Sequence, residues 1–171
     1  SKMGLTPFDC MILAAELEFR GMIAAPVEVV ILDGNPIGYP SSVRLKPGAA
    51  TGINVKNGVF AAVNGRFGEV TVDPDDYTEV ELRWLDDGQV STSNIKTDQL
   101  TSVVGSRSDL IEEHAHIQSL GEVLSGSKVH TFSLADCKFS PATLGSFVDS
   151  ITWAEAAVSR LTLKGNRITG S

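Results

Sequence analysis

Apolar and polar positions near the two ends of the chain follow the same frame. Residues 27–37 read VEVVILDGNPI and residues 158–168 read VSRLTLKGNRI. Both segments carry aliphatic residues at their first, fourth and sixth positions, Gly-Asn at the eighth and ninth, and Ile at the eleventh. Residues 129–139, VHTFSLADCKF, repeat the frame with Cys137 in the Asn position and Phe139 in the Ile position. The spacing predicts a short strand in each segment, with its apolar residues turned into a core.

Helical spacing precedes the first frame. Thr6 and Pro7 are typical of the N-cap and first position of a helix, and Gly21 follows its last turn. Apolar residues recur at helical spacing between these ends. We therefore expect a helix over residues 6–21 whose buried stripe consists of Phe8, Ile12, Ala15 and Phe19.

Two more helices are predicted before the other two frames. The segment 140–151 opens with Ser140 as N-cap and Pro141 at the first helical position. Its apolar face consists of Leu144, Phe147, Val148 and Ile151. A further helix is expected over about residues 108–124. Its buried residues are Ile117, Leu120 and Leu124, and Gly126 follows its end.

The centre of the chain has a different pattern. Residues 58–72, GVFAAVNGRFGEVTV, predict two strands joined by an Asn64-Gly65 turn. Residues 78–84, TEVELRW, alternate strictly between polar and apolar, as a half-buried strand does. Because 102 residues separate Leu32 from Leu134, the centre is too long to be a loop within a compact domain. We expect it to fold as a separate all-β insertion.

The frame resembles the leucine-rich repeat L-x-x-L-x-L-x-x-N/C-x-L. Leu134 and Leu163 are 29 residues apart, and this spacing is similar to the ribonuclease-inhibitor type of that family. The resemblance implies a short α/β solenoid of parallel strands alternating with helices. Its structural repeat positions are Asn35, Cys137 and Asn166. An Asn side chain both donates and accepts, so it bonds the backbone where the chain leaves the sheet, whereas Cys137 packs there and bonds weakly.

The central segment resembles a small SH3-like barrel of the Tudor or KOW sort. The organisation expected from both resemblances is a first repeat unit at residues 5–40, an inserted barrel at 43–104, and the remaining repeat units at 106–171. The barrel carries four aromatic candidates for a cage that binds a methylated cation: Phe60, Phe67, Tyr77 and Trp84. Packing in the barrel core is the favoured interpretation of these rings, and a peptide or methyl-lysine reader is the alternative.

Composition narrows the choice of partner and compartment. The chain has 171 residues, a formal charge of −7 and a hydrophobic fraction of 42%. It lacks the basic stripe of a nucleic-acid binder and an apolar run long enough for a membrane span, so neither partner is expected. It has two cysteines, Cys10 and Cys137, each among apolar neighbours. No disulfide framework is indicated, and we expect a reducing, cytoplasmic location.

Residues that often carry chemistry form no recognisable constellation. His114 and His116 stand two apart, which points them away from each other on a helix, so a solvated helix face is favoured over a metal site. His130 has no acid or nucleophile at triad spacing. The acidic DPDDYTE run at residues 73–79 lacks the spacing of a calcium loop and predicts a turn. No cofactor or metal is expected.

The sequence therefore predicts a non-enzymatic protein-interaction or scaffold module, and a small enzyme of unrecognised class is a further alternative. In the repeat family partners dock on the concave sheet face, which here consists of Val29, Ile31, Asp33, His130, Thr131, Ser133, Arg160, Thr162 and Lys164. Val29 and Ile31 are unusual on a surface that stays wet. Since no helix follows the last frame, we expect a fragment of a larger repeat protein, or self-association through an uncapped C-terminal repeat.

Overall fold

The computed structural model describes residues 4–22, 25–72 and 78–168. The chain divides into two compact units. The first unit combines Ser1–Ser41 with His114–Ser171, and the second is Ser42–Glu113. The second unit thus ends at Glu113 rather than at residue 104, where the sequence placed the end of the insertion.

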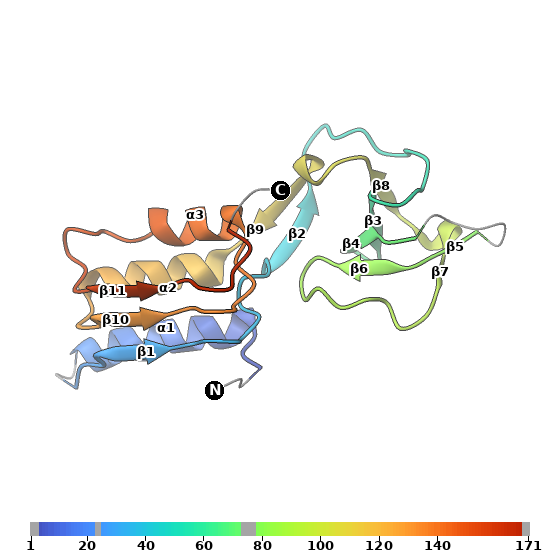
Figure 1. Ribbon diagram of the computed structural model, residues 1–171. Coiled ribbons are helices and arrows are strands. Elements are labelled where there is room, and N and C mark those ends of the chain that lie inside the picture. Colours follow the sequence, from blue (N-terminus) through green and yellow to red (C-terminus); the bar gives the residue numbers. More distant parts are fainter. Residues whose placement is uncertain (1–3, 23–24, 73–77, 169–171) are drawn as a thin grey trace. The chain divides into compact units, whose positions relative to one another are not determined.

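The first unit contains a parallel sheet with the strand order β1-β10-β11. The strands are β1 (Val29–Ile31), β10 (Thr131–Ser133) and β11 (Arg160–Thr162). Val30 aligns with Phe132, and Phe132 aligns with Leu161. The three frames of the sequence therefore lie side by side in one register, as their shared spacing predicts (Figure 1).

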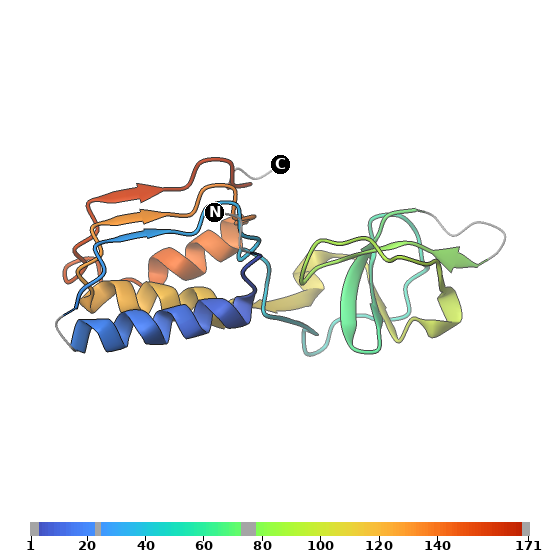
Figure 2. The ribbon, with the colours of Figure 1, turned by 90° about the horizontal axis from the view of Figure 1, so that it is seen from below.

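Three helices cover one face of this sheet (Figure 2). They are α1 (Pro7–Met22), α2 (Ala115–Gly126) and α3 (Pro141–Asp149). The predicted caps of α3 are confirmed, because Ser140 Oγ accepts a hydrogen bond from the Thr143 amide at 3.2 Å and Pro141 opens the helix. None of the helices in the described segments combines the length and apolarity that a membrane crossing requires.

The helices and the sheet enclose one apolar core. Three phenylalanines, Phe132, Phe139 and Phe147, are fully buried in it. The Phe147 ring stacks on Phe132 with centroids 5.8 Å apart and meets Phe139 edge-on at 6.1 Å. The core therefore joins a strand, the turn after it and the next helix, in agreement with the alternating pattern of the frames.

The turns that follow the strands are packed backbone to backbone. The Gly38 amide donates to the Cys137 carbonyl at 2.8 Å, and the Gly34 amide donates to the Ala135 carbonyl at 2.8 Å. A Cβ atom on Gly38 would lie 2.5 Å from the Lys138 carbonyl carbon. Glycine is therefore required at residue 38 for the two turns to approach this closely.

Two helix predictions are wrong in detail. The buried residues of α1 are Cys10, Ala14 and Leu17, whereas the predicted stripe of Phe8, Ile12, Ala15 and Phe19 is exposed. The predicted helix over residues 108–124 begins only at Ala115. Its first part is a 3₁₀ turn, Arg107–Asp109, and strand β9, Leu110–Glu113.

The described residues of the second unit form three small sheets. The largest has the order β6-β4-β3-β8, built from β6 (Leu82–Trp84), β4 (Arg66–Val70), β3 (Phe60–Val63) and β8 (Ser102–Val104). Strand β2 (Ser42–Leu45) pairs with β9, and β5 (Glu79–Val80) pairs with β7 (Ile95–Lys96). The predicted hairpin at Asn64-Gly65 is confirmed by the antiparallel pairing of β3 with β4.

The two faces of the four-stranded sheet carry separate apolar clusters. One cluster includes Val70, Leu82 and Ile95, and the other includes Phe60, Phe67 and Leu110. The first reaches the β5–β7 pair and the second reaches the β2–β9 pair. Strand β9 is thus required to cover one face of the insertion, which explains why the second unit extends to Glu113.

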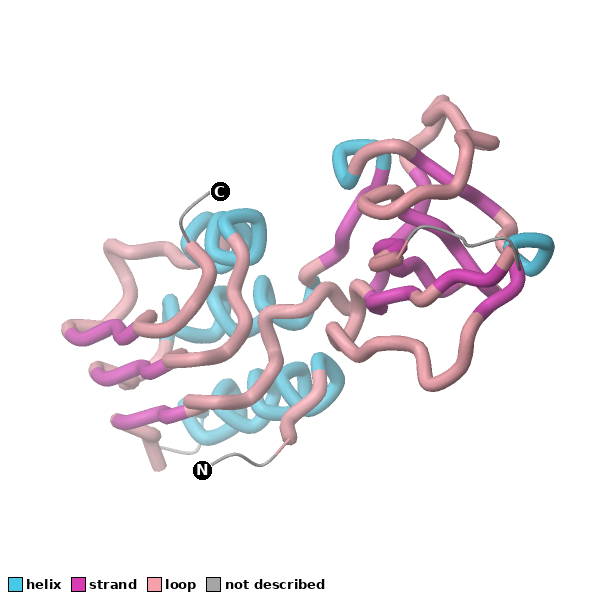
Figure 3. Tube along the Cα trace, turned by 45° about the vertical axis from the view of Figure 1, so that its right-hand side comes forward, coloured by secondary structure: helices cyan, strands magenta, loops and turns pink. Residues whose placement is uncertain are grey.

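The fold class expected from the sequence, a leucine-rich-repeat solenoid interrupted by an SH3-like all-β barrel, is wrong. The described residues form a mixed α/β structure with three helices and four small sheets, and none of these sheets closes on itself (Figure 3). No solenoid is identified in the described part of the chain. The central strands pair as one sheet and two separate ribbons instead of closing a barrel, and the three parallel strands stay an open sheet.

Candidate functional site

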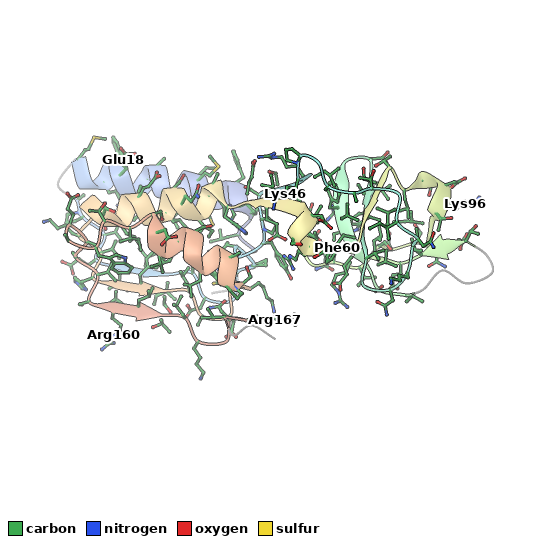
Figure 4. All side chains as sticks on the ribbon, turned by 90° about the horizontal axis from the view of Figure 1, so that it is seen from above. Glu18, Lys46, Phe60, Lys96, Arg160 and Arg167 are labelled. Atoms are coloured by element: carbon green, nitrogen blue, oxygen red, sulfur yellow. The ribbon has the colours of Figure 1, made fainter. Side chains whose placement is uncertain are left out.

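The outer face of the parallel sheet, the side away from the three helices, carries the residues that the sequence assigned to partner binding. The register aligns Val29 with Thr131 and Arg160 in one row. The next row aligns Ile31 with Ser133 and Thr162. Arg160 lies on the opposite side of the unit from α1 (Figure 4). The alternation that turns Val30, Phe132 and the partly buried Leu161 toward the helices therefore turns these six side chains to the opposite face.

The chemistry of this outer face changes across the sheet. Val29 and Ile31 on β1 are 49% and 57% exposed, although both are apolar. Strand β10 contributes the hydroxyl groups of Thr131 and Ser133. Strand β11 contributes the exposed cation Arg160. The face thus runs from an apolar edge to a basic edge, and Lys164, which is also exposed, follows β11.

Asp33 holds two neighbouring turns together. Its Oδ1 accepts hydrogen bonds from Ser133 Oγ at 2.6 Å and from the Ala135 amide at 2.8 Å. Ser133 is 8% exposed as a result of this packing. Both residues therefore support the edge of the outer face, and their polar groups are already engaged with each other.

His130 immediately precedes β10. Its side chain is 46% exposed, and its Nε2 is 3.5 Å from a carboxylate oxygen of Glu28. Its carbonyl accepts hydrogen bonds from the Ser159 and Arg160 amides, each at 3.0 Å. Its imidazole is thus available on the surface beside an acidic neighbour.

The three repeat positions form a ladder of hydrogen bonds in the turns that follow the strands. The Asn166 side chain donates to the Leu134 and Leu163 carbonyls at 2.7 and 2.9 Å, and accepts from the Cys137 and Phe139 amides, each at 3.0 Å. Asn35 donates to the Leu32 carbonyl at 2.8 Å. These bonds satisfy backbone groups that leave the sheet and have no strand partner there.

Cys137 occupies the middle rung of that ladder. Its Sγ lies 3.1 Å from the Leu32 carbonyl oxygen. Burial raises the pKa of this thiol to about 11, and burial likewise raises the pKa of Cys10 to about 12. Both residues are free thiols with no exposed surface. Because only the thiolate is strongly nucleophilic, neither cysteine has the environment of a reactive or catalytic residue.

The aromatic candidates of the second unit do not share one surface. Phe60 and Phe67 are buried in one cluster, whereas Trp84 packs against the cluster on the opposite face of the sheet. The Arg66 guanidinium lies 4.5 Å from the centroid of the Trp84 ring. Tyr77 lies outside the described residues. The structure therefore brings Phe60 and Phe67 together in a core, and the Trp84 ring is already covered by Arg66.

His114 and His116 are not on a solvated helix face, contrary to the interpretation of the sequence. They are 5% and 0% exposed, and their ring centroids are 6.4 Å apart. His116 Nε2 is 2.7 Å from the Ile37 carbonyl oxygen, to which it donates a hydrogen bond. The described segments contain no group of three His, Cys, Asp or Glu residues that is suited to hold a metal ion.

Burial of His116 predicts a dependence of stability on pH. Burial lowers the pKa of His116 below its usual 6.5, and the bond to Ile37 opposes this shift. A histidine whose pKa is lower in the folded state than in the unfolded state takes up its proton more readily when unfolded. It therefore does not reduce stability above the unfolded-state pKa, and stability is lost as the pH falls below that value. We expect unfolding by urea to show a loss of up to about 1.4 kcal/mol from this group between pH 7.5 and pH 5.5.

His116→Gln tests whether His116 causes this loss of stability, because Gln keeps a donor for the Ile37 carbonyl but does not titrate. The variant should be less acid-sensitive than the native chain over that range. An unchanged slope in His116→Gln contradicts the assignment.

The sequence did not predict that α1 exposes an apolar face. Phe8, Ile12 and Phe19 lie on it, although the sequence assigned them to the core. The available signal was that apolar residues occupy two sides of this helix, since Cys10, Ala14 and Leu17 form a second stripe. Only one side of a helix at the edge of a two-layer unit packs against the core.

The comparisons with known proteins give no relationship. No protein-family model, curated protein or solved structure matches the chain. The functional argument therefore depends on the geometry of the chain itself.

Proposed function

We propose that the protein is a non-enzymatic binding module that docks another polypeptide on the outer face of the β1-β10-β11 sheet. The observation that carries the proposal is the exposure of Val29 and Ile31, at 49% and 57%, in a regular sheet whose other face is fully used by the core. Adjacent exposed β-branched residues favour an interaction surface over a solvated one.

The charge of the face defines the partner more closely. The apolar side chains lie on β1, and Arg160 and Lys164 lie on and after β11. A partner that fits this face places apolar side chains over Val29 and Ile31 and acidic groups over the two cations. Electrostatic complementarity of this kind determines orientation and association rate.

We also propose a reducing, intracellular compartment for this module. Support comes from Cys10 and Cys137, which are free and buried and whose pKa values are raised by burial. Structural disulfides, which are typical of secreted domains, play no part in this unit's ladder of turns.

Photo-cross-linking in cells tests the docking face. A benzoylphenylalanine placed at Ile31 is expected to give a discrete adduct with another polypeptide, because the side chain is 57% exposed on the apolar edge of the face. The same label at Val90, which is 39% exposed in the second unit, is the matched control and should give no such adduct. Adding Arg160→Glu and Lys164→Glu to the Ile31 label should reduce the adduct by about tenfold, which corresponds to about 1.4 kcal/mol of binding free energy.

Two results contradict the proposal. One is the absence of any polypeptide adduct at Ile31. The other is an adduct of equal yield at Val90. Circular dichroism of each labelled chain checks that the fold is retained.

A further inference from the structure

Helix α1 exposes a second apolar surface, on the opposite side of the unit from the sheet face. Five large apolar side chains are exposed along it. They are Phe8 (69%), Met11 (48%), Ile12 (54%), Phe19 (52%) and Met22 (73%). The core of the unit uses the other side of the helix, through Cys10, Ala14 and Leu17. We call these five residues and Ala15 the outer stripe of α1.

The outer stripe has the spacing of a helix-pairing seam. Phe8, Ile12, Ala15, Phe19 and Met22 follow one another at intervals of four, three, four and three residues. These intervals place apolar residues at the a and d positions of a heptad, which is the pattern by which one helix packs along another. The small Ala15 in the middle leaves room for a large side chain of the opposing helix. The stripe is therefore shaped for a helix.

A groove between α1 and α2 continues the stripe. Its volume is about 460 Å³, and Met22 lines it together with Leu17 and Val123. Gly21 and Gly126 also line the groove, and their lack of side chains leaves it open. A groove with an apolar floor beside a helical seam is suited to take an anchoring side chain of a docked helix.

The charges around this surface are mostly acidic. Asp9, Glu16 and Glu18 flank the outer stripe, and Glu122 lines the groove opposite Glu18. Of the cations, Arg20 is bonded to Glu16 at 2.6 Å, and Lys128 lines the end of the groove. Glu18 lies on the exposed side of α1, away from the sheet (Figure 4). The surface thus favours a basic partner and repels a second copy of itself.

We infer that the outer stripe of α1 and the adjoining groove bind an amphipathic helix of another protein whose polar face is basic. The docked helix packs its apolar side along the Phe8, Ile12 and Phe19 side chains and inserts one anchor between α1 and α2. Its Lys or Arg residues lie beside Glu18 and Glu122. This surface is separate from the outer face of the sheet, so binding at either does not require the other.

The test uses a helical peptide of the length of α1, with Leu at the a and d positions and Lys at the flanking positions. Fluorescence anisotropy with the full chain should show saturable binding to this peptide. A peptide with the same Leu pattern and Glu in place of Lys should bind at least about tenfold more weakly, because it meets Glu18 and Glu122 with like charges.

Variants of the chain separate the two contributions. Phe19→Ser should weaken binding of the basic peptide by about tenfold through the seam, and Glu18→Lys with Glu122→Lys should weaken it similarly through charge. Matched controls are Val90→Ser, at an exposed apolar position of the second unit, and Glu155→Lys, at an exposed acidic position of the first. Both controls should bind as the native chain does, and all variants should keep the native circular dichroism spectrum because the changed side chains are exposed.

Three outcomes overturn the inference. The first is binding of the basic and acidic peptides with equal affinity, or of neither. The second is a dimer of the native chain in light scattering that Phe19→Ser dissociates, which assigns the stripe to a second copy. The third is binding of the chain to phosphatidylserine vesicles that Phe19→Ser abolishes, which assigns the stripe to a lipid surface. None of them affects the cross-link from Ile31, so failure here is distinct from failure of the sheet-face proposal.

Discussion

Phe147→Ala is expected to lower the free energy of unfolding of the first unit by about 3–5 kcal/mol. Phe147 has no exposed surface and contacts the rings of both Phe132 and Phe139. Removal of its ring leaves a cavity between α3, β10 and the turn after β10. The loss is measured by hydrogen exchange of the β10 amides as urea increases, because these amides report on the first unit alone.

Trp153→Ala provides the control for this change. Its indole is 46% exposed, and its Nε1 donates to the Val148 carbonyl at 3.2 Å. We expect it to cost less than about 1.5 kcal/mol, since one exposed hydrogen bond and little apolar area are lost. Equal losses for Phe147→Ala and Trp153→Ala would show that the three phenylalanines do not form the centre of the core.

Gly38→Ala is expected to destabilise the first unit by about 3 kcal/mol, at the upper end of the usual cost of overpacking. The added methyl group would lie 2.5 Å from backbone atoms of Lys138 and Phe139. A backbone segment held by the ladder cannot move aside as a side-chain end does. Thermal unfolding followed by the fluorescence of Trp153, in a Trp84→Phe background, measures the effect in this unit.

Gly145→Ala is the matched substitution without a clash. Gly145 lies inside α3, and nothing is within 4 Å of the position that its Cβ would take. Alanine is preferred to glycine in a helix, so this variant should gain about 0.5–1 kcal/mol. Opposite signs for the two alanine substitutions are the expected result, and a loss at Gly145 as large as that at Gly38 would contradict the close contact of the turns.

The local pattern of the sequence predicted the register of the parallel sheet. The frame places Val30, Phe132 and Leu161 at the same position, because the same residue types recur at the same spacing, and the strands pair in that register. The alternation within each frame also gave the outward positions of Val29 and Ile31. In contrast, the frame did not determine how many strands a sheet contains or whether a sheet closes, and the expected fold class failed at that level.

Long-range pairing accounts for the errors in the elements. Residues 110–113, LIEE, carry apolar residues that fit a helical pattern as well as a strand. They become strand β9 because β2 pairs with them, Ser42 with Glu113 and Leu45 with Leu110. The sequence around residue 110 gives no indication of its pairing with β2, because β2 lies far away along the chain.

The candidate site was predictable only in part for a similar reason. Alternation predicted which side chains face outward on the strands, but not that Asp33 would bond Ser133 and the Ala135 amide. For α1, apolar residues on two sides of one helix left the choice of buried side open, and the packing of Cys10 and Leu17 decided it. The sequence alone therefore did not show which of the two apolar sides of α1 is exposed.

The pairing of Ser42 with Glu113 has a consequence for how the chain reaches its native state. On the ribosome, α1 and β1 emerge long before β10, the strand on which β1 depends. The insertion folds from one continuous segment, Ser42–Glu113, and its completed β2–β9 ribbon brings its own entry and exit points together. Because the folded insertion already joins its two ends, pairing β1 with β10 closes only a short loop. The entropy cost of this closure is therefore smaller than it would be with the whole insertion unfolded. Folding of the second unit thus favours folding of the first. A substitution that weakens the β2–β9 pairing should therefore slow the folding of the first unit.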